Sequence, residues 1–197
     1  NGVFAVIEPA VTLNEEEVRR LWAAVAPGQV VAPVQLQADG TVASFGAARI
    51  AGAGVYRVLA DHPVEDLAGF EGARVDVPLL AGRTFAMTGA DFEQVAKAHG
   101  GTAPQSLAQI SARLAALGGM SRVSVLTDIL CARFSPDLAF GGAPDGDIPC
   151  GHSEPDDTEA AVALLRRAGF RVRGWESAGD EPAPILEWLR PHPSSRR

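Results

Sequence analysis

The side chains best suited to chemistry gather within residues 135–157. Cysteine, histidine and carboxylate groups are the usual protein ligands of metal ions, and this stretch combines all three: Cys150, His152, Asp145, Asp147, Glu154, Asp156 and Asp157. It also holds four prolines and four glycines in 23 residues, a composition typical of linkers and irregular flaps. A metal-binding loop and a solvated acidic linker are the two interpretations, and the composition favours the linker.

Nucleophilic catalysis is the second chemistry that the cysteines permit. Cys131 or Cys150 could act as a nucleophile with His152 as its base, but the surrounding sequence shows neither a nucleophile elbow nor a third, orienting residue. The two cysteines do not form a CxxC pair, and two are too few for a disulfide scaffold. We therefore expect small buried or half-buried thiols, with one disulfide between them as the alternative.

The third candidate is the acid at the end of the first apolar run. Residues 3–7 are apolar without interruption, as in strands buried on both faces of a parallel sheet, and the run stops at Glu8-Pro9. The Glu8 carboxylate is a hard oxygen ligand of the kind that divalent cations prefer. A solvated strand-end acid, or an ion-pair partner of an arginine, is the other interpretation.

Hydrophobic patterning sets out the elements that must position these residues. Asp39-Gly40 is typical of a hairpin turn, and Asn14 is typical of a helix N-cap, whereas residues 46–72 are rich in loop signals. Strands are expected at 3–7, 29–34, 74–80, 84–87, 123–126 and 170–172, with 34–36 and 41–43 as the two arms of the hairpin. Helices are expected between Asn14 and Pro27 and at 90–98, 106–117 and 159–168, with one or two helical turns at 185–189.

The composition excludes several classes of protein. The 197 residues are 47% hydrophobic and 21% charged, which favours a packed core over disorder. A formal net charge of -7 argues against a nucleic-acid groove or a polybasic membrane anchor, and no apolar run reaches membrane-spanning length. No charged segment precedes an apolar stretch after Asn1, so the sequence predicts no signal peptide in these residues.

The order of these features resembles the second half of the family 2 glycosyltransferases, which are inverting enzymes with a GT-A fold. The likeness covers roughly residues 3–133 and rests on the order and spacing of several short motifs. The matching segments are the proline-to-Asp-Gly hairpin at 33–40, Leu80-Ala81-Gly82 ahead of Phe92, Gly100-Gly101, the helix at 106–113 and Leu117-Gly118.

The resemblance implies an α/β fold, a partial GT-A-like mixed sheet flanked by helices that forms the acceptor-side half of the family's domain. We expect this domain at residues 1–134, a Pro/Gly/acid-rich linker at 135–157, and a small C-terminal αβ appendage with a frayed tail at 158–197. The family's donor-binding half would precede residue 1, so a longer chain or a partner chain is expected to supply it.

The resemblance also implies a site, and two of its positions depart from the family. In the family an acidic pair binds the Mg²⁺ or Mn²⁺ that neutralises the diphosphate leaving group, and here Glu8 is followed by Ala10. Gln109 occupies the position of the general base and cannot act as one. The residues expected to contact substrate are Gly82, Arg83, Arg113 and Arg133. The arginines would do so through phosphate groups.

The implied function is transfer of a sugar from a nucleotide-sugar donor to a glycan or lipid acceptor, in polysaccharide or glycolipid assembly. Because both carboxylate positions are substituted, we expect transfer to be impaired. A non-catalytic interaction domain that binds a partner domain or glycan is the first alternative. The second is a Rossmann-like domain beginning at 121–128, which lacks the Gly-rich fingerprint. The expected location is the cytoplasm or the periphery of the inner membrane face.

Overall fold

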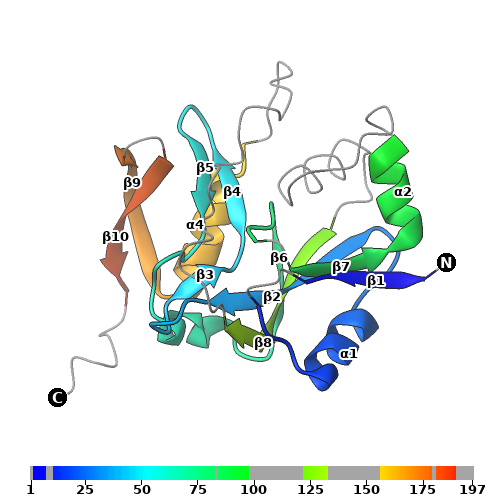
Figure 1. The fold of residues 1–197 in the computed structure, drawn as a ribbon. Helices are drawn as coiled ribbons and strands as arrows, with labels where there is room; N and C mark the ends of the chain where they lie inside the picture. The colour runs from blue at the N-terminus through cyan, green and yellow to red at the C-terminus, as the bar shows by residue number, and fades with distance from the viewer. Residues whose placement is uncertain are drawn as a thin grey trace.

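The computed structural model describes residues 2–7, 11–82, 84–97, 122–132, 156–178 and 181–189 of the chain. Its elements are drawn in Figure 1. In chain order they are β1 (Val3–Val6), α1 (Glu15–Ala23), β2 (Gln29–Leu36), β3 (Val42–Ser44), β4 (Ala47–Ile50), β5 (Gly54–Arg57), the 3₁₀ helix η1 (Val64–Phe70), β6 (Arg74–Val77), β7 (Phe85–Thr88), α2 (Gly89–Lys97), β8 (Arg122–Ala132), α4 (Thr158–Arg167), β9 (Phe170–Ala178) and β10 (Glu181–Trp188). No helix in these ranges is long and apolar enough to cross a membrane.

A mixed sheet is the centre of the fold. Its strands follow the order β1-β7-β2-β8-β6, and β3 also pairs with β2. β2 and β8 run parallel, whereas the other neighbouring strands of this sheet are antiparallel. The expected α/β class is confirmed at this level, as a mixed sheet with few helices.

β1 is an edge strand, and the prediction of a strand buried on both faces was wrong. Among the described strands, β1 has one neighbour, β7, with which it pairs antiparallel. Val3 and Val6 remain 40% and 39% exposed. Phe4 turns inward and meets the Phe92 ring edge-to-face, with centroids 5.2 Å apart. An apolar run shows strand propensity, but it does not fix how many neighbours the strand has.

The predicted Asp39-Gly40 hairpin is confirmed between β2 and β3. Gly40 has φ +85°, which favours glycine. Asp39 Oδ1 accepts hydrogen bonds from the backbone N–H and the hydroxyl of Thr41 at 3.0 and 2.7 Å, and these bonds hold the pKa of Asp39 below its ordinary value. The turn thereby fixes the register in which Gln35 lies opposite Ser44.

Buried side chains fill both sides of the main sheet. The larger cluster joins the sheet to β4, η1, α4 and β9, and includes the Phe45 and Phe70 rings, 4.9 Å apart. The smaller cluster lies under α1, where Leu21 is fully buried. Figure 1 shows α1 and the β9–β10 ribbon on opposite sides of the molecule. Asn14 caps α1 as predicted, through reciprocal hydrogen bonds with Glu17.

The segment expected to be loop-rich, residues 46–72, holds ordered elements. β4 and β5 form an antiparallel hairpin, and η1 follows with Phe70 and Leu67 in the core. These elements are only four to seven residues long. Short elements leave few periods of a hydrophobic pattern to read.

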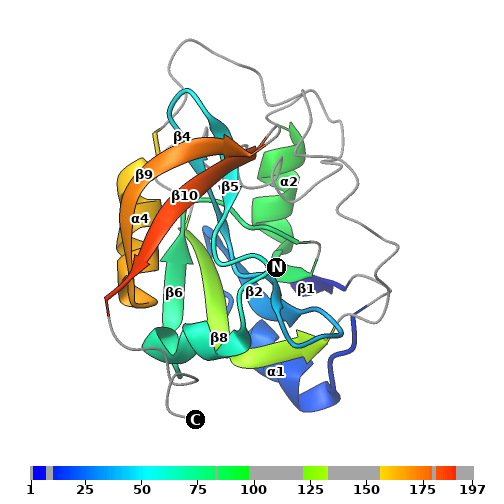
Figure 2. The ribbon, with the colours of Figure 1, turned by 90° about the vertical axis from the view of Figure 1, so that its left-hand side faces the viewer.

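The C-terminal elements differ from the prediction at one point. Residues 185–189 were expected to be helical, but β10 is a strand paired antiparallel with β9. Five residues hold little more than one helical turn, so their apolar pattern does not separate helix from strand, and pairing with β9 decides the outcome. Pro182 and Pro184 are tolerated because β9 is the one strand paired with β10 among the described residues. In Figure 2 the β9–β10 ribbon crosses in front of α4 and the β4–β5 hairpin.

α4 packs into the same core as the main sheet. Ala161, Leu164 and Leu165 on the helix, and Phe170 after it, belong to the cluster that also contains Val34 of β2. The division of the chain into parts at 134 and 157 stays a prediction.

Tyr56 gives the first testable prediction. It is the only tyrosine in the chain, it is 8% exposed, and its ring meets Trp175 edge-to-face at 5.2 Å. Burial raises the pKa of Tyr56 to about 12 from an ordinary value of 10.0. Because the folded-state pKa is the higher one, the associated stability is complete below pH 10 and is lost as the pH rises toward 12.

We expect the free energy of unfolding to fall by about 2 to 3 kcal/mol across that interval. Denaturant unfolding at a series of pH values measures the loss, and tyrosinate absorbance measures ionisation directly. Tyr56→Phe keeps the ring and should lose markedly less stability over the same interval. Equal losses in the two proteins would contradict the assignment.

Candidate functional site

Gly82 is the one site residue predicted from the resemblance that lies within the described ranges. The other site residues that the resemblance predicts lie outside these ranges: Glu8, Arg83, Gln109, Arg113 and Arg133. Cys150 and His152 of the cysteine–histidine motif also lie outside them. The site is therefore built outward from Gly82.

Gly82 lies in a turn that comes very close to β2 and β3. Its φ is +106°, and a Cβ added there would lie 2.8 Å from Ser44 Oγ and 3.0 Å from Gln35 Oε1. The backbone conformation and the close approach both require glycine. The hydroxyl of Ser44 donates a hydrogen bond to the carbonyl oxygen of Ala81, so the turn at 81–82 covers these two side chains.

Gln35 is the centre of three buried side chains that lie in register across three strands. Ser44 of β3 and Cys131 of β8 are its direct neighbours in the sheet, and the three are 1–3% exposed. We call Ser44, Gln35 and Cys131 the polar row. It lies one residue before the ends of the parallel strands β2 and β8, and ligands of α/β sheets bind at the carboxyl ends of parallel strands.

The side-chain amide of Gln35 is not satisfied. Neither Nε2 nor Oε1 has a hydrogen-bond partner among the described residues, although both atoms are buried. Cys131, by contrast, donates to the carbonyl oxygen of Val34 at 3.2 Å. A buried amide without a partner costs roughly 1 to 3 kcal/mol, and such groups in folded proteins often mark a bound water or ligand.

Two of the three residues of the polar row, Gln35 and Ser44, were not predicted as functional. The signal in the sequence was slight: Gln35 is a polar residue that directly follows the apolar run of β2. Cys131 is confirmed as a buried residue. The Cys131 thiol is the one ionisable group of the row and donates to Val34 O, so the row offers a ligand the neutral hydrogen-bonding groups of Gln35 and Ser44.

A metal centre does not emerge from the described ranges. They contain no group of three or more His, Cys, Asp or Glu side chains that could hold an ion. Glu8, the predicted ligand, lies outside them.

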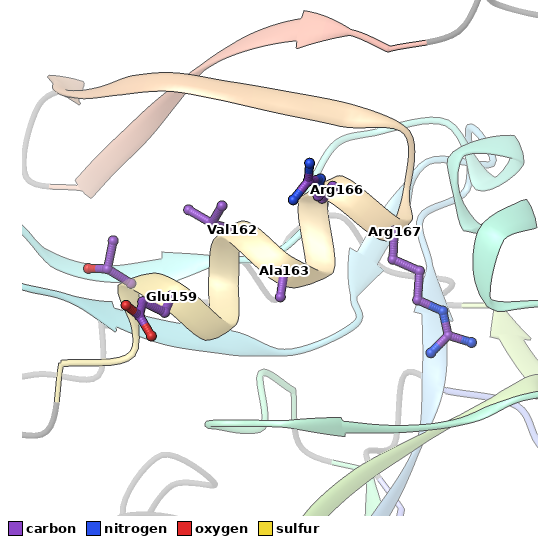
Figure 3. Close-up of a pocket in the computed structure, with 6 residues that line it drawn as sticks. Glu159, Val162, Ala163, Arg166 and Arg167 are labelled. Atoms are coloured by element: carbon purple, nitrogen blue, oxygen red, sulfur yellow. The ribbon is translucent and has the colours of Figure 1, made fainter.

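A surface hollow of about 550 Å³ beside α4 is lined, among described residues, by that helix alone. Figure 3 shows Arg166 and Arg167 pointing to different sides of the helix. Arg167 Nε donates to the carbonyl oxygen of Gly69 at 3.0 Å, and its guanidinium lies 4.8 Å from the centre of the Phe70 ring. The contacts of Arg167 attach α4 to η1, and the hollow is not the candidate site.

Comparison of the chain with protein-family models and with curated proteins gives no match.

Proposed function

We propose that this chain is a glycosyltransferase-like domain that binds the sugar portion of its ligand at the polar row. The observation that carries the proposal is the buried, unpartnered amide of Gln35 beside Gly82. The order of sequence motifs, which resembles that of family 2 glycosyltransferases, suggests the class of ligand: a nucleotide sugar or the sugar end of a glycan.

The chemistry of the polar row supports a neutral, hydroxylated ligand. The Gln35 amide offers two N–H donors and one carbonyl acceptor, which matches hydroxyl groups that both donate and accept. No arginine, lysine or histidine belongs to the row, so it offers a diphosphate none of the positive charge that such a group needs. The sugar, rather than the phosphates, is therefore the part assigned to Gln35.

Binding would require the turn at 81–82 to move. Gln35 and Ser44 are buried beneath this turn, and Ser44 is hydrogen bonded to Ala81. A ligand hydroxyl would replace that contact and satisfy Gln35 at the same time. The ligand would make two hydrogen bonds to a desolvated amide that has no partner among the described residues.

The proposal assigns no catalytic base. In the alignment to the family, Gln109 stands where the base is expected, and a glutamine amide does not accept a proton near neutral pH. We therefore propose that the domain binds its ligand but transfers the sugar poorly. Titration with and without Mn²⁺ measures whether binding depends on a metal ion.

Isothermal titration tests the proposed function. UDP-glucose, UDP-N-acetylglucosamine and GDP-mannose are titrated into the protein with and without Mn²⁺, and UDP and GDP serve as ligands without the sugar. We expect saturable binding of at least one sugar nucleotide, at least tenfold tighter than its matched nucleotide. Equal affinity for both, or no binding to any, would contradict the proposal.

A further inference from the structure

A second cluster of polar and aromatic side chains lies beside the polar row's strands but uses different residues. His62 Nδ1 and Asp66 Oδ2 are 2.9 Å apart, and the two side chains are 25% and 3% exposed. The His62 ring meets Phe170 edge-to-face at 5.1 Å, and the Phe170 ring lies 4.2 Å from that of Trp188. Trp188 is 43% exposed, so a partly buried imidazole and a half-exposed indole flank one buried phenyl ring.

Asp66 sets the chemical state of the imidazole. A carboxylate can only accept a hydrogen bond, so Nδ1 of His62 carries the proton in this pair. The other ring nitrogen, Nε2, is then an acceptor in the neutral imidazole. Among the described residues, Nδ1 is the only atom of the His62 ring with a hydrogen-bond partner.

The backbone just before His62 is held in an uncommon conformation. Leu59 and Asp61 have φ of 57° and 64°, and a left-handed conformation costs non-glycine residues on the order of 1 kcal/mol or more. The segment is fixed by hydrogen bonds from Asp61 N–H to Val42 O at 2.9 Å and from Val42 N–H to His62 O at 2.8 Å. Backbone strain that a fold maintains in this way is common at binding sites.

The acidic side chains nearest His62 disfavour an anionic ligand at its imidazole. Asp61 and Glu65 are exposed on either side of it, Asp66 lies behind it, and Asp39 is in the hairpin whose Thr41 bridges to Pro63. These acceptors suit hydroxyl donors, and a half-exposed indole suits the apolar face of a sugar ring.

We propose that His62, Asp66 and Trp188 form a sugar-binding site. A ligand hydroxyl donates a hydrogen bond to Nε2 of His62, and the sugar ring lies on the indole of Trp188. Asp66 is a positioning residue, because it acts through the imidazole. The inference does not rest on the proposed function, since none of its residues belongs to the polar row.

Nuclear magnetic resonance of the ¹⁵N-labelled protein tests the site. Long-range imidazole spectra should show His62 protonated at Nδ1 and not at Nε2, the reverse of the usual preference of free histidine. Titration with methyl α-glucoside, methyl β-galactoside and methyl α-mannoside should move the His62 Nε2 signal saturably for at least one. Trp188→Leu should weaken that response at least tenfold, whereas Trp22→Leu, which removes an exposed tryptophan of α1, should leave it unchanged.

Several results would overturn the inference. They are an Nε2-protonated His62, no saturable movement with any glycoside, equal weakening by both tryptophan variants, or a response to methylammonium at lower concentration than to the glycosides. Because Trp188→Leu could perturb β10, His62→Gln is the second variant. Its calorimetric affinity for the responding glycoside should fall at least tenfold, and unchanged affinity would also overturn the inference. Binding at the polar row is read from Gln35 signals, so the two proposals fail separately.

Discussion

Replacing Gly69 with alanine is expected to destabilise the protein by about 3 kcal/mol or more, because overpacking against backbone leaves little room to relax. A Cβ at this position would lie 2.2 Å from the carbonyl oxygen of Arg167, where the end of α4 meets η1. Neither partner is a flexible side-chain tip. The added methyl group must push α4 away from η1, which also breaks the hydrogen bond from Arg167 Nε to Gly69 O.

Urea unfolding of Gly69→Ala and of Gly174→Ala measures this effect against a matched control. Gly174 in β9 has ordinary space around it, since its added Cβ would meet only Ile185 Cδ1 at 3.7 Å. We expect Gly174→Ala to change the free energy of unfolding by no more than about 1 kcal/mol. If Gly69→Ala is as stable as Gly174→Ala, α4 does not pack on η1 as described.

Replacing Gln35 with methionine is expected to have two opposite effects. The side chains have nearly the same shape, so the change removes an unsatisfied amide without leaving a cavity. The free energy of unfolding should rise by roughly 1 to 3 kcal/mol, and binding of the sugar nucleotide found by titration should be lost. A gain in stability that accompanies a loss of binding is the usual signature of a functional polar group in a core.

Gln29→Met is the control for that experiment. Gln29 lies in the same strand, but its Oε1 accepts a hydrogen bond from Arg74, so this variant should lose stability and keep binding. If Gln35→Met is instead less stable than the natural protein, the amide has a partner in the folded chain. Retained binding in Gln35→Met would remove Gln35 from the site.

Elements that begin or end at a characteristic turn or cap were predicted correctly from the sequence. The Asp39-Gly40 turn and the Asn14 cap each depend on residues within a few positions of one another, and the predicted helix at 159–168 agrees with α4 to within one residue. β10 was mispredicted because its strand depends on pairing with β9, which residues 185–189 do not contain locally. The exposure of β1 depends on its position in the sheet, which no local pattern contains.

The polar row could not have been predicted from local patterns. Gln35 is paired with Cys131 only because the register of β2 and β8 shifts between Pro33 and Val34, so that Leu126 and Leu130 face consecutive residues of β2. A shift by one residue would turn the other face of β8 toward the same partners. The His62–Asp66 pair was not predicted either, although its two complementary side chains stand only four positions apart.

The central claim is that a ligand hydroxyl satisfies the buried amide of Gln35. Titration of the responding sugar nucleotide into the ¹⁵N-labelled protein tests this hydrogen bond through the side-chain NH₂ signals of Gln35. These signals are identified by their absence in Gln35→Met. The account predicts saturable movement of these signals, with the same dissociation constant as calorimetry gives, and no movement with the nucleotide alone. Unmoved Gln35 signals at saturating ligand would contradict it.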